Sequence, residues 1–64
     1  MNITITINTD NDAFSQNMNT ETGRILEVLV EKLHRDEVDV HVGESAYLLD
    51  SNGNTVGKFV VTRS

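Results

Sequence analysis

Few residues in this sequence have a type and spacing that could support chemistry. Asp39 and His41 alternate with valines, so they share one face of an extended segment, and such a pair can orient an imidazole for base catalysis. No nucleophile is recognisable beside them, and no serine lies in a G-x-S-x-G elbow. His34 falls on the polar side of a helical segment near its end, where compensation of the helix dipole accounts for it. We therefore predict a protein that is not an enzyme.

Metal binding has equally little support. Asp10 and Asp12 form an Asp-x-Asp pair, which turn formation through side-chain hydrogen bonds explains. Residues 50–54 resemble the start of a calcium loop, but Thr55 stands where that loop needs Gly and Val61 where it needs Glu. The absence of cysteine excludes disulfides and thiolate metal sites, and the 4 glycines form no phosphate-binding loop. We expect no cofactor and no metal.

The first element that the sequence predicts is an N-terminal strand. Residues 2–8 alternate strictly between isoleucine and polar residues, which is typical of a half-buried strand. Residues 9–20 are rich in Asn, Asp, Ser and Thr, which indicates a loop. Phe14 and Met18 are the large apolar residues of this loop, and we expect both to pin it to the core.

One amphipathic helix is predicted over residues 21–35. Its apolar residues recur at helical spacing and form a single stripe, with acidic and basic residues opposite. Asn19 or Thr20 can cap the free N–H groups at its start. Residues 38–42 then alternate valine with polar residues, which permits an extra short strand before the β-hairpin.

A β-hairpin closes the sequence. Residues 46–50 and 55–62 predict its two strands. Asn52-Gly53 between them predicts a two-residue type I′ turn, which requires positive φ at both residues. Such a turn fixes the register of the two strands.

In the predicted register Leu49 pairs with Val56 and Leu48 with Gly57, where the missing side chain leaves room for Leu48 or for a helix. Both faces of the hairpin are then substantially apolar, whereas one helix covers one face. The uncovered face is a candidate interface, made of Tyr47, Leu49, Val56, Lys58 and Val60. The alternative is that the loop of residues 9–20 or the extra strand at 38–42 covers it.

Together these elements predict an α+β fold of order β-α-β-β, with one amphipathic helix packed on one face of a small antiparallel sheet. The length of 64 residues allows one domain, spanning residues 1–64, with a marginal core. We expect the core to contain Ile3, Ile5, Ile7, Ile25, Leu26, Leu29, Leu33, Leu48, Phe59 and Val61.

Charge is unevenly distributed in a chain whose net charge is −5. Without a basic stripe the chain is a poor nucleic-acid binder, because phosphate contacts supply most of that affinity. An acidic segment could instead dock on a basic partner; its residues are Asp36, Glu37, Asp39 and Glu44. Alternatively, these acids only solvate a loop and a strand edge.

The longest apolar run is short and no charged-then-apolar leader opens the sequence. We therefore expect neither a signal peptide nor contact with a membrane. The absence of cysteine suits a reducing compartment. These features predict a protein of the cytoplasm.

Three segments resemble a widespread group of short proteins encoded by bacteriophages and prophages. They are TITINTDNDAF at the start, GRILEVLVEKL in the helix and LLDSNGNTVGKFVV at the end. Residues 36–47 are longer and more acidic than is usual in that group. The resemblance implies a phage-borne accessory protein in the bacterial cytoplasm, and it transfers no catalytic residue.

Two functions of different classes are open on this basis. The first is a small inhibitor of a host defence complex, anti-CRISPR-like or otherwise anti-defence, which occludes a surface of a host protein or ribonucleoprotein. It would use the acidic segment or the uncovered sheet face. The second is a structural or assembly accessory of the phage, a homodimer with no host target.

Overall fold

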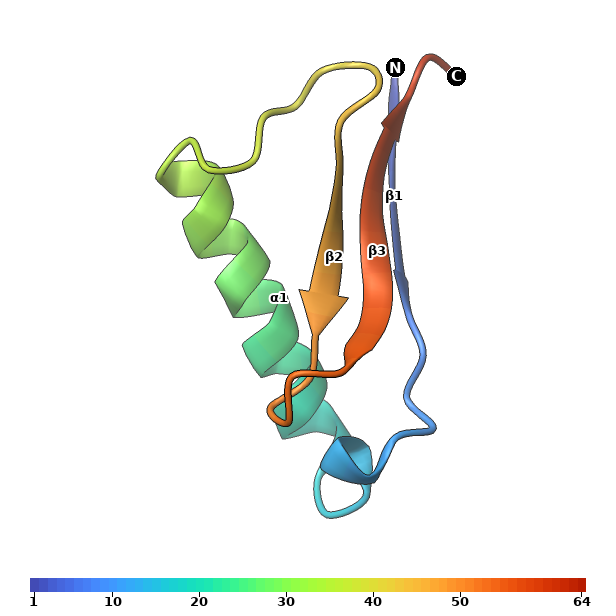
Figure 1. Cartoon of the computed structure of the whole chain (residues 1–64), viewed down its shortest axis with the longest axis vertical. Coiled ribbons are helices and arrows are strands. Elements are labelled where there is room, and N and C mark those ends of the chain that lie inside the picture. The colour runs from blue at the N-terminus through green and yellow to red at the C-terminus, as the bar shows by residue number, and fades with distance from the viewer.

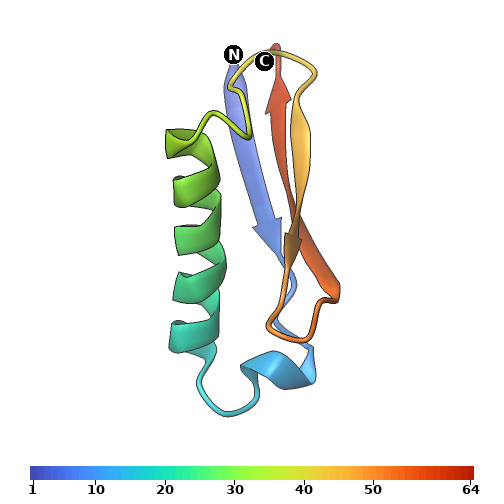
Figure 2. The same cartoon turned by 60° about the vertical axis from the view of Figure 1, so that its left-hand side comes forward.

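The structure, a computed structural model, describes all residues from 1 to 64. Its elements in chain order are β1 (Asn2–Ile7), the 3-10 turn η1 (Asp12–Phe14), α1 (Met18–His34), β2 (Ser45–Leu49) and β3 (Thr55–Thr62). The strands form one antiparallel sheet of order β1-β3-β2, and α1 runs alongside it (Figure 1, Figure 2). The predicted α+β fold of order β-α-β-β is confirmed.

β3 is the central strand of the sheet, and Phe59 in its middle stands opposite Ile5 of β1 and Ala46 of β2. Residues opposite each other in a ladder share a face. Phe59 and Val61, two positions apart on β3, are both fully buried, so this face is the one that α1 covers.

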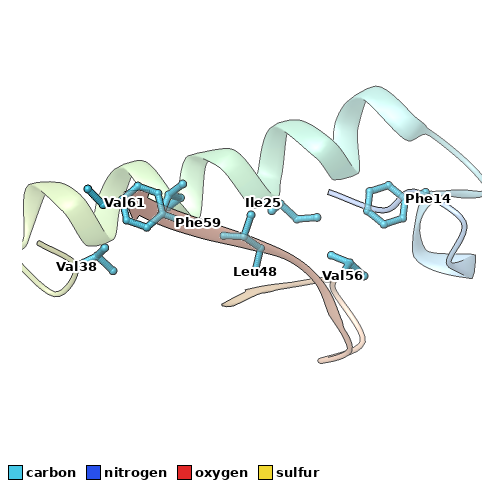
Figure 3. Close-up of a cluster of buried hydrophobic side chains, with 8 residues drawn as sticks. Phe14, Ile25, Val38, Leu48, Val56, Phe59 and Val61 are labelled. Atoms are coloured by element: carbon cyan, nitrogen blue, oxygen red, sulfur yellow. The ribbon is translucent and has the colours of Figure 1, made fainter. Parts of the chain in front are cut away.

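The core is one cluster of buried apolar side chains between α1 and the sheet, closed at one end by η1 (Figure 3). Its members are Phe14, Ile25, Leu29, Val38, Leu48, Val56, Phe59 and Val61. The structure confirms Ile25, Leu29, Leu48, Phe59 and Val61 as predicted core residues, and places Ile7 and Leu33 at its margin.

Three predicted core residues are wrong. Ile3 and Ile5 are 50% and 44% exposed, and Leu26 is 37% exposed. The cause is the strand order: β1 is an edge strand, and the buried residues of α1 cluster with residues of β2 and β3. Ile3 and Ile5 therefore share the covered face of the sheet but extend past the helix.

The helix begins earlier than predicted, at Met18 instead of residue 21. Its N-cap is Asn17, whose Oδ1 accepts a hydrogen bond of 3.0 Å from the Thr20 backbone N–H; neither Asn19 nor Thr20 caps it. Phe14 pins the loop to the core as predicted, with 2% of its surface exposed. Met18, the first residue of α1, does not, because it is 53% exposed.

The hairpin turn differs from the predicted type I′ turn. Gly53 has a φ of +85°, but Asn52 has no positive φ. The Gly53 N–H donates to the Asp50 carbonyl at 3.1 Å and the Asp50 N–H to the Asn54 carbonyl at 2.9 Å, which gives a three-residue loop. A β-turn followed by a glycine in the left-handed region is the common form of such a loop.

The longer loop changes the register near the turn. Leu48 still faces Gly57, but Leu49 faces Thr55, so Val56 has no opposite residue on β2. This bulge turns Val56 to the helix side, where it is buried, and corrects its predicted place on the uncovered face. The space at Gly57 serves β1, because a Cβ there would collide with the Thr6 carbonyl oxygen. It does not serve the helix or Leu48.

The predicted extra strand at 38–42 does not form. The backbone just before this segment closes the helix: the Asp36 N–H donates to the Leu33 carbonyl and the Glu37 N–H to the Lys32 carbonyl, with Asp36 at a φ of +59°. This is the Schellman pattern of a helix end. Val38 follows directly and enters the core.

Candidate functional site

An apolar groove of about 240 Å³ runs between α1 and β2 and is the candidate site. Its lining residues are Arg24, Ile25, Val28, Leu29, Lys32, Ala46, Tyr47, Leu48, Leu49 and Asp50. The groove exists because β2 is an edge strand and α1 rises beside it (Figure 1). Ile25 and Leu29 point into the core, whereas Val28 faces the groove and stays half exposed.

The backbone along the groove is partly unpaired. The Val61 N–H donates to the Glu44 carbonyl at 2.9 Å, which fixes the alternation of the β2–β3 ladder. Ser45, Tyr47 and Leu49 consequently direct their backbone groups away from β3, along the free edge of β2. An edge of this kind can take an extended peptide as an additional strand, with pockets beside it for alternate side chains.

Two cationic side chains border the groove. Arg24 donates from Nη2 to the Leu49 carbonyl at 3.1 Å and so satisfies one acceptor of the free edge. Its guanidinium also holds both carboxylate oxygens of Glu21, at 3.1 Å each. Lys32 forms no ion pair within the chain, so its charge remains available to an acidic group in the groove.

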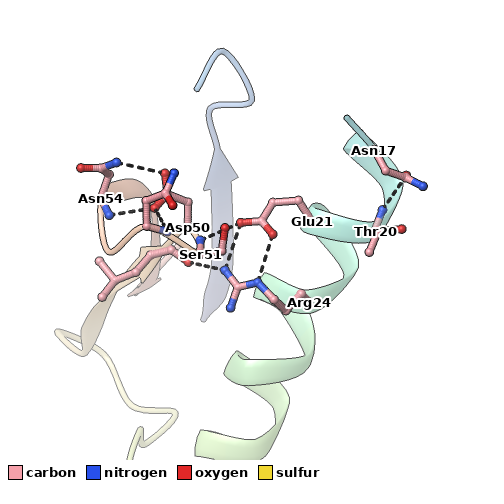
Figure 4. Close-up of polar contacts among 9 residues, drawn as sticks. Asn17, Thr20, Glu21, Arg24, Asp50, Ser51 and Asn54 are labelled. Atoms are coloured by element: carbon pink, nitrogen blue, oxygen red, sulfur yellow. Dashed lines mark hydrogen bonds and ion pairs between the residues drawn. The ribbon is translucent and has the colours of Figure 1, made fainter. Parts of the chain in front are cut away.

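Glu21 joins the helix to the hairpin turn (Figure 4). Besides Arg24, its carboxylate accepts a 2.8 Å hydrogen bond from the Ser51 backbone N–H, and it is buried. The hydrogen bonds from Arg24 lower the pKa of Glu21, against burial, which would raise it, and the Ser51 N–H lowers it further. The same pairing raises the pKa of Arg24.

Asp50 organises the turn itself (Figure 4). Its Oδ1 accepts from the backbone N–H groups of Asn52 at 2.9 Å and Asn54 at 2.8 Å, and its Oδ2 accepts from the Asn54 side chain at 3.3 Å. Burial alone would raise the pKa of Asp50, but the Asn54 and Asn52 hydrogen bonds outweigh it and leave the pKa below its usual value. Asp50 lines the groove, and Glu21 holds the groove residue Arg24.

The predicted interface is largely placed on the uncovered face of the sheet. Tyr47 and Leu49 are 65% and 47% exposed, Lys58 is exposed and Val60 is partly exposed. The Lys58 ammonium lies 5.7 Å from the centre of the Tyr47 ring, a cation–π contact. Tyr47 is covered neither by the loop of residues 9–20 nor by residues 38–42. Val56 is the exception, as described for the bulge.

The predicted acidic segment lies in the connection from α1 to β2 and is partly neutralised; its residues are Asp36, Glu37, Asp39 and Glu44. Arg35 lies 4.0 Å from Glu37. Glu44 folds back on its own loop, accepting from the Asp39 backbone N–H at 3.4 Å and lying 3.6 Å from Nε2 of His41. These acids are spread around a loop rather than aligned on one edge.

The other residues considered for chemistry are not brought together. His41 meets Glu44 instead of Asp39, and Asn8 rather than Asp10 makes the turn hydrogen bond, accepting from the Asp10 N–H at 2.9 Å. Asp12 begins η1. Nowhere do three His, Cys, Asp or Glu side chains gather in a way that could hold a metal. α1 is too short and too polar to cross a membrane.

The sequence carried only a partial signal for this site. Glu21 and Arg24 stand three positions apart on a helix, a spacing at which side chains meet, but their joint reach to Ser51 and Leu49 depends on tertiary packing. The groove itself depends on where α1 lies over the sheet. That placement was not predicted.

Comparisons of the chain with protein-family models, with curated proteins and with solved structures found no match. The resemblance to short phage proteins therefore stays a prediction. What supports a function is the geometry of the groove and of the two sheet edges.

Proposed function

We propose that this chain is a non-enzymatic protein-binding module of phage origin that acts in the bacterial cytoplasm and inhibits a host defence complex by occluding one of its surfaces. The observation that carries the proposal is the apolar groove beside the free edge of β2. An inhibitor of this kind needs an adhesive surface rather than a reaction centre. The groove, with Tyr47 and Leu49 at its rim, supplies one.

The groove defines the chemistry of its target. An extended segment of the target would add to the edge of β2 through the backbone groups of Ser45 and Tyr47. One of its apolar side chains would lie against Val28 and Leu49, and an acidic neighbour would meet Lys32. The volume of about 240 Å³ accommodates one large side chain.

A pair of valine variants tests the proposal. Val28→Glu puts a carboxylate into the groove, whereas Val42→Glu puts the same group at a similarly exposed valine outside it. Wild-type chain should retain a defence complex from host lysate and should raise phage plating on a host that carries that defence. Val28→Glu should lose both effects and Val42→Glu should keep them. Equal behaviour of the two variants would show that the groove is not the binding surface.

A second candidate, the phage assembly accessory that forms a homodimer, is favoured by a different observation. β1 is an uncharged edge strand with half-exposed isoleucines, which suits association with another chain. The plating assay separates the two functions, since an assembly accessory leaves host defence intact whatever the state of the groove.

A further inference from the structure

The outer edge of β1 is an unused hydrogen-bonding surface. The Asn8 N–H donates to the Val56 carbonyl at 2.7 Å, and this bond fixes the alternation of the β1–β3 ladder. Thr4 and Thr6 therefore bond to β3, whereas Ile3, Ile5 and Ile7 direct their N–H and C=O groups outward. No other segment of the chain pairs with that edge.

An apolar strip accompanies this edge. The half-exposed Ile3 and Ile5 stand beside Val61 and Phe59 on the face that α1 covers. On the side of α1 away from the groove, Leu26 and Val30 are also exposed, at 37% and 48%. The strip therefore lies between the free edge and the helix, where a neighbouring strand and its side chains would bury it.

The strip is also free of charge. Residues 2–7 carry no ionisable side chain, no proline and no glycine, in a chain whose net charge is −5. Natural edge strands are usually protected by lysine, proline, a bulge or a cover. β1 has none of these, and a second copy of the chain could approach here without bringing acidic side chains together.

We propose that two copies of this chain pair through β1 in antiparallel fashion, with the two-fold axis at Ile5. In that register Ile5 faces Ile5 of the second copy and Ile3 faces Ile7, so every outward N–H and C=O finds a partner. On the other face of the sheet, Thr4 of one copy faces Thr6 of the second copy, which is a favourable cross-strand pair. The product is a six-stranded sheet of order β2-β3-β1-β1-β3-β2.

The edge of β2 is a poorer place for a second copy. Arg24 already occupies the Leu49 carbonyl there, and Lys32, which has no ion pair, would bring its charge toward Lys32 of the second copy. The proposed dimer leaves both β2 edges at the outer ends of the sheet. Each copy keeps its groove, so the dimer does not rest on the proposed function. An experiment that refutes the dimer does not refute target binding in the groove, and the reverse also holds.

Two proline variants test which edge pairs. Ile5→Pro removes an outward N–H of β1 and keeps the ladder to β3, and Tyr47→Pro is its counterpart on the edge of β2. Sedimentation should give wild type and Tyr47→Pro twice the 7.1 kDa of one chain, and Ile5→Pro the single mass. Circular dichroism checks that both variants are folded. A wild-type chain that sediments at the single mass, or loss of the dimer only in Tyr47→Pro, overturns the proposal.

Disulfide cross-linking tests the register of the β1–β1 pairing independently of the proline variants. The chain has no cysteine, so each introduced thiol is unique. Opposed residues of a hydrogen-bonded pair lie about 5.5 Å apart between Cα atoms, within reach of a disulfide. Ile5→Cys should therefore cross-link to itself under oxidation, and Ile3→Cys should cross-link to Ile7→Cys but not to itself. Self-linkage of Ile3→Cys in place of Ile5→Cys would refute pairing centred on Ile5.

Discussion

The helix–hairpin part of the molecule and the strand β1 contain similar apolar residues but are held very differently. The helix and hairpin share the buried core and are also joined by polar contacts from Glu21 and Arg24 to Ser51 and Leu49. β1 is held by its ladder to β3, and its Ile3 and Ile5 stay half exposed. The difference shows that hydrophobic alternation places a residue on a face, whereas the helix decides whether that face is covered.

The largest expected effect is the loss of stability on truncation of Phe59, compared with truncation of Ile5 opposite it. Phe59→Ala removes a side chain that is 1% exposed and should cost about 3–5 kcal/mol, close to the whole stability of a small domain. Ile5→Ala should cost only about 1 kcal/mol, because Ile5 is already half exposed. Urea unfolding at low protein concentration measures both. Similar losses would mean that β1 belongs to the core after all.

Gly57→Ala tests how β1 is attached. The added Cβ would collide with the Thr6 carbonyl oxygen and lie 3.2 Å from the Ile7 Cα, so β1 must move away from β3. A forced backbone shift of this kind costs about 1–3 kcal/mol. Hydrogen exchange should show faster exchange at Thr4 and Thr6 than the global loss explains, while the amides of α1 follow the global change. Uniform acceleration would show that the two parts unfold as one.

Acid should weaken the helix–hairpin connection selectively. The pKa values of Glu21 and Asp50 lie below their usual 4.5 and 3.8, so folding favours both carboxylates. Their contribution is fully present above the unfolded pKa values and is lost as pH falls through the folded ones. The free energy of unfolding should therefore fall below about pH 4.5.

Two glutamine variants test whether Glu21 causes the loss of stability in acid. Glu21→Gln should lower stability at neutral pH and flatten the pH dependence. Glu27→Gln, at an exposed helix position without a hydrogen bond or ion pair, should do neither. An unchanged pH profile in Glu21→Gln would assign the acid sensitivity to other carboxyls.

The sequence predicted the elements well because each has a strong period of its own. The alternation of residues 2–8 and the apolar stripe of the helix are local properties, and both elements formed. The turn was mispredicted because the Asp50 carboxylate organises a three-residue loop that the Asn52-Gly53 signal does not report. One residue of extra loop then moved Val56 to the other face.

The candidate site was less predictable because it depends on strand order and helix placement. Tyr47 and Leu49 were correctly placed on the sheet face that the helix leaves uncovered, yet the groove beside them forms only because β2 is an edge strand next to α1. Likewise, nothing local distinguishes the isoleucines of an edge strand from those of a central one. The order β1-β3-β2 makes that distinction.

The smallest expected effect comes from a substitution that stabilises the helix–hairpin part and leaves β1 unchanged. Gly23 lies inside α1, its φ is not positive, and a Cβ there would meet no atom within 4 Å. Gly23→Ala should therefore raise the free energy of unfolding by up to about 1 kcal/mol, the difference in helix propensity between the two residues. Hydrogen exchange should slow at the amides of α1. Opening of β1 by local fraying should not change, since the added Cβ would meet no atom of that strand within 4 Å. Slower exchange at Thr4 and Thr6 to the same degree as in α1 would show that β1 opens only when the whole molecule unfolds.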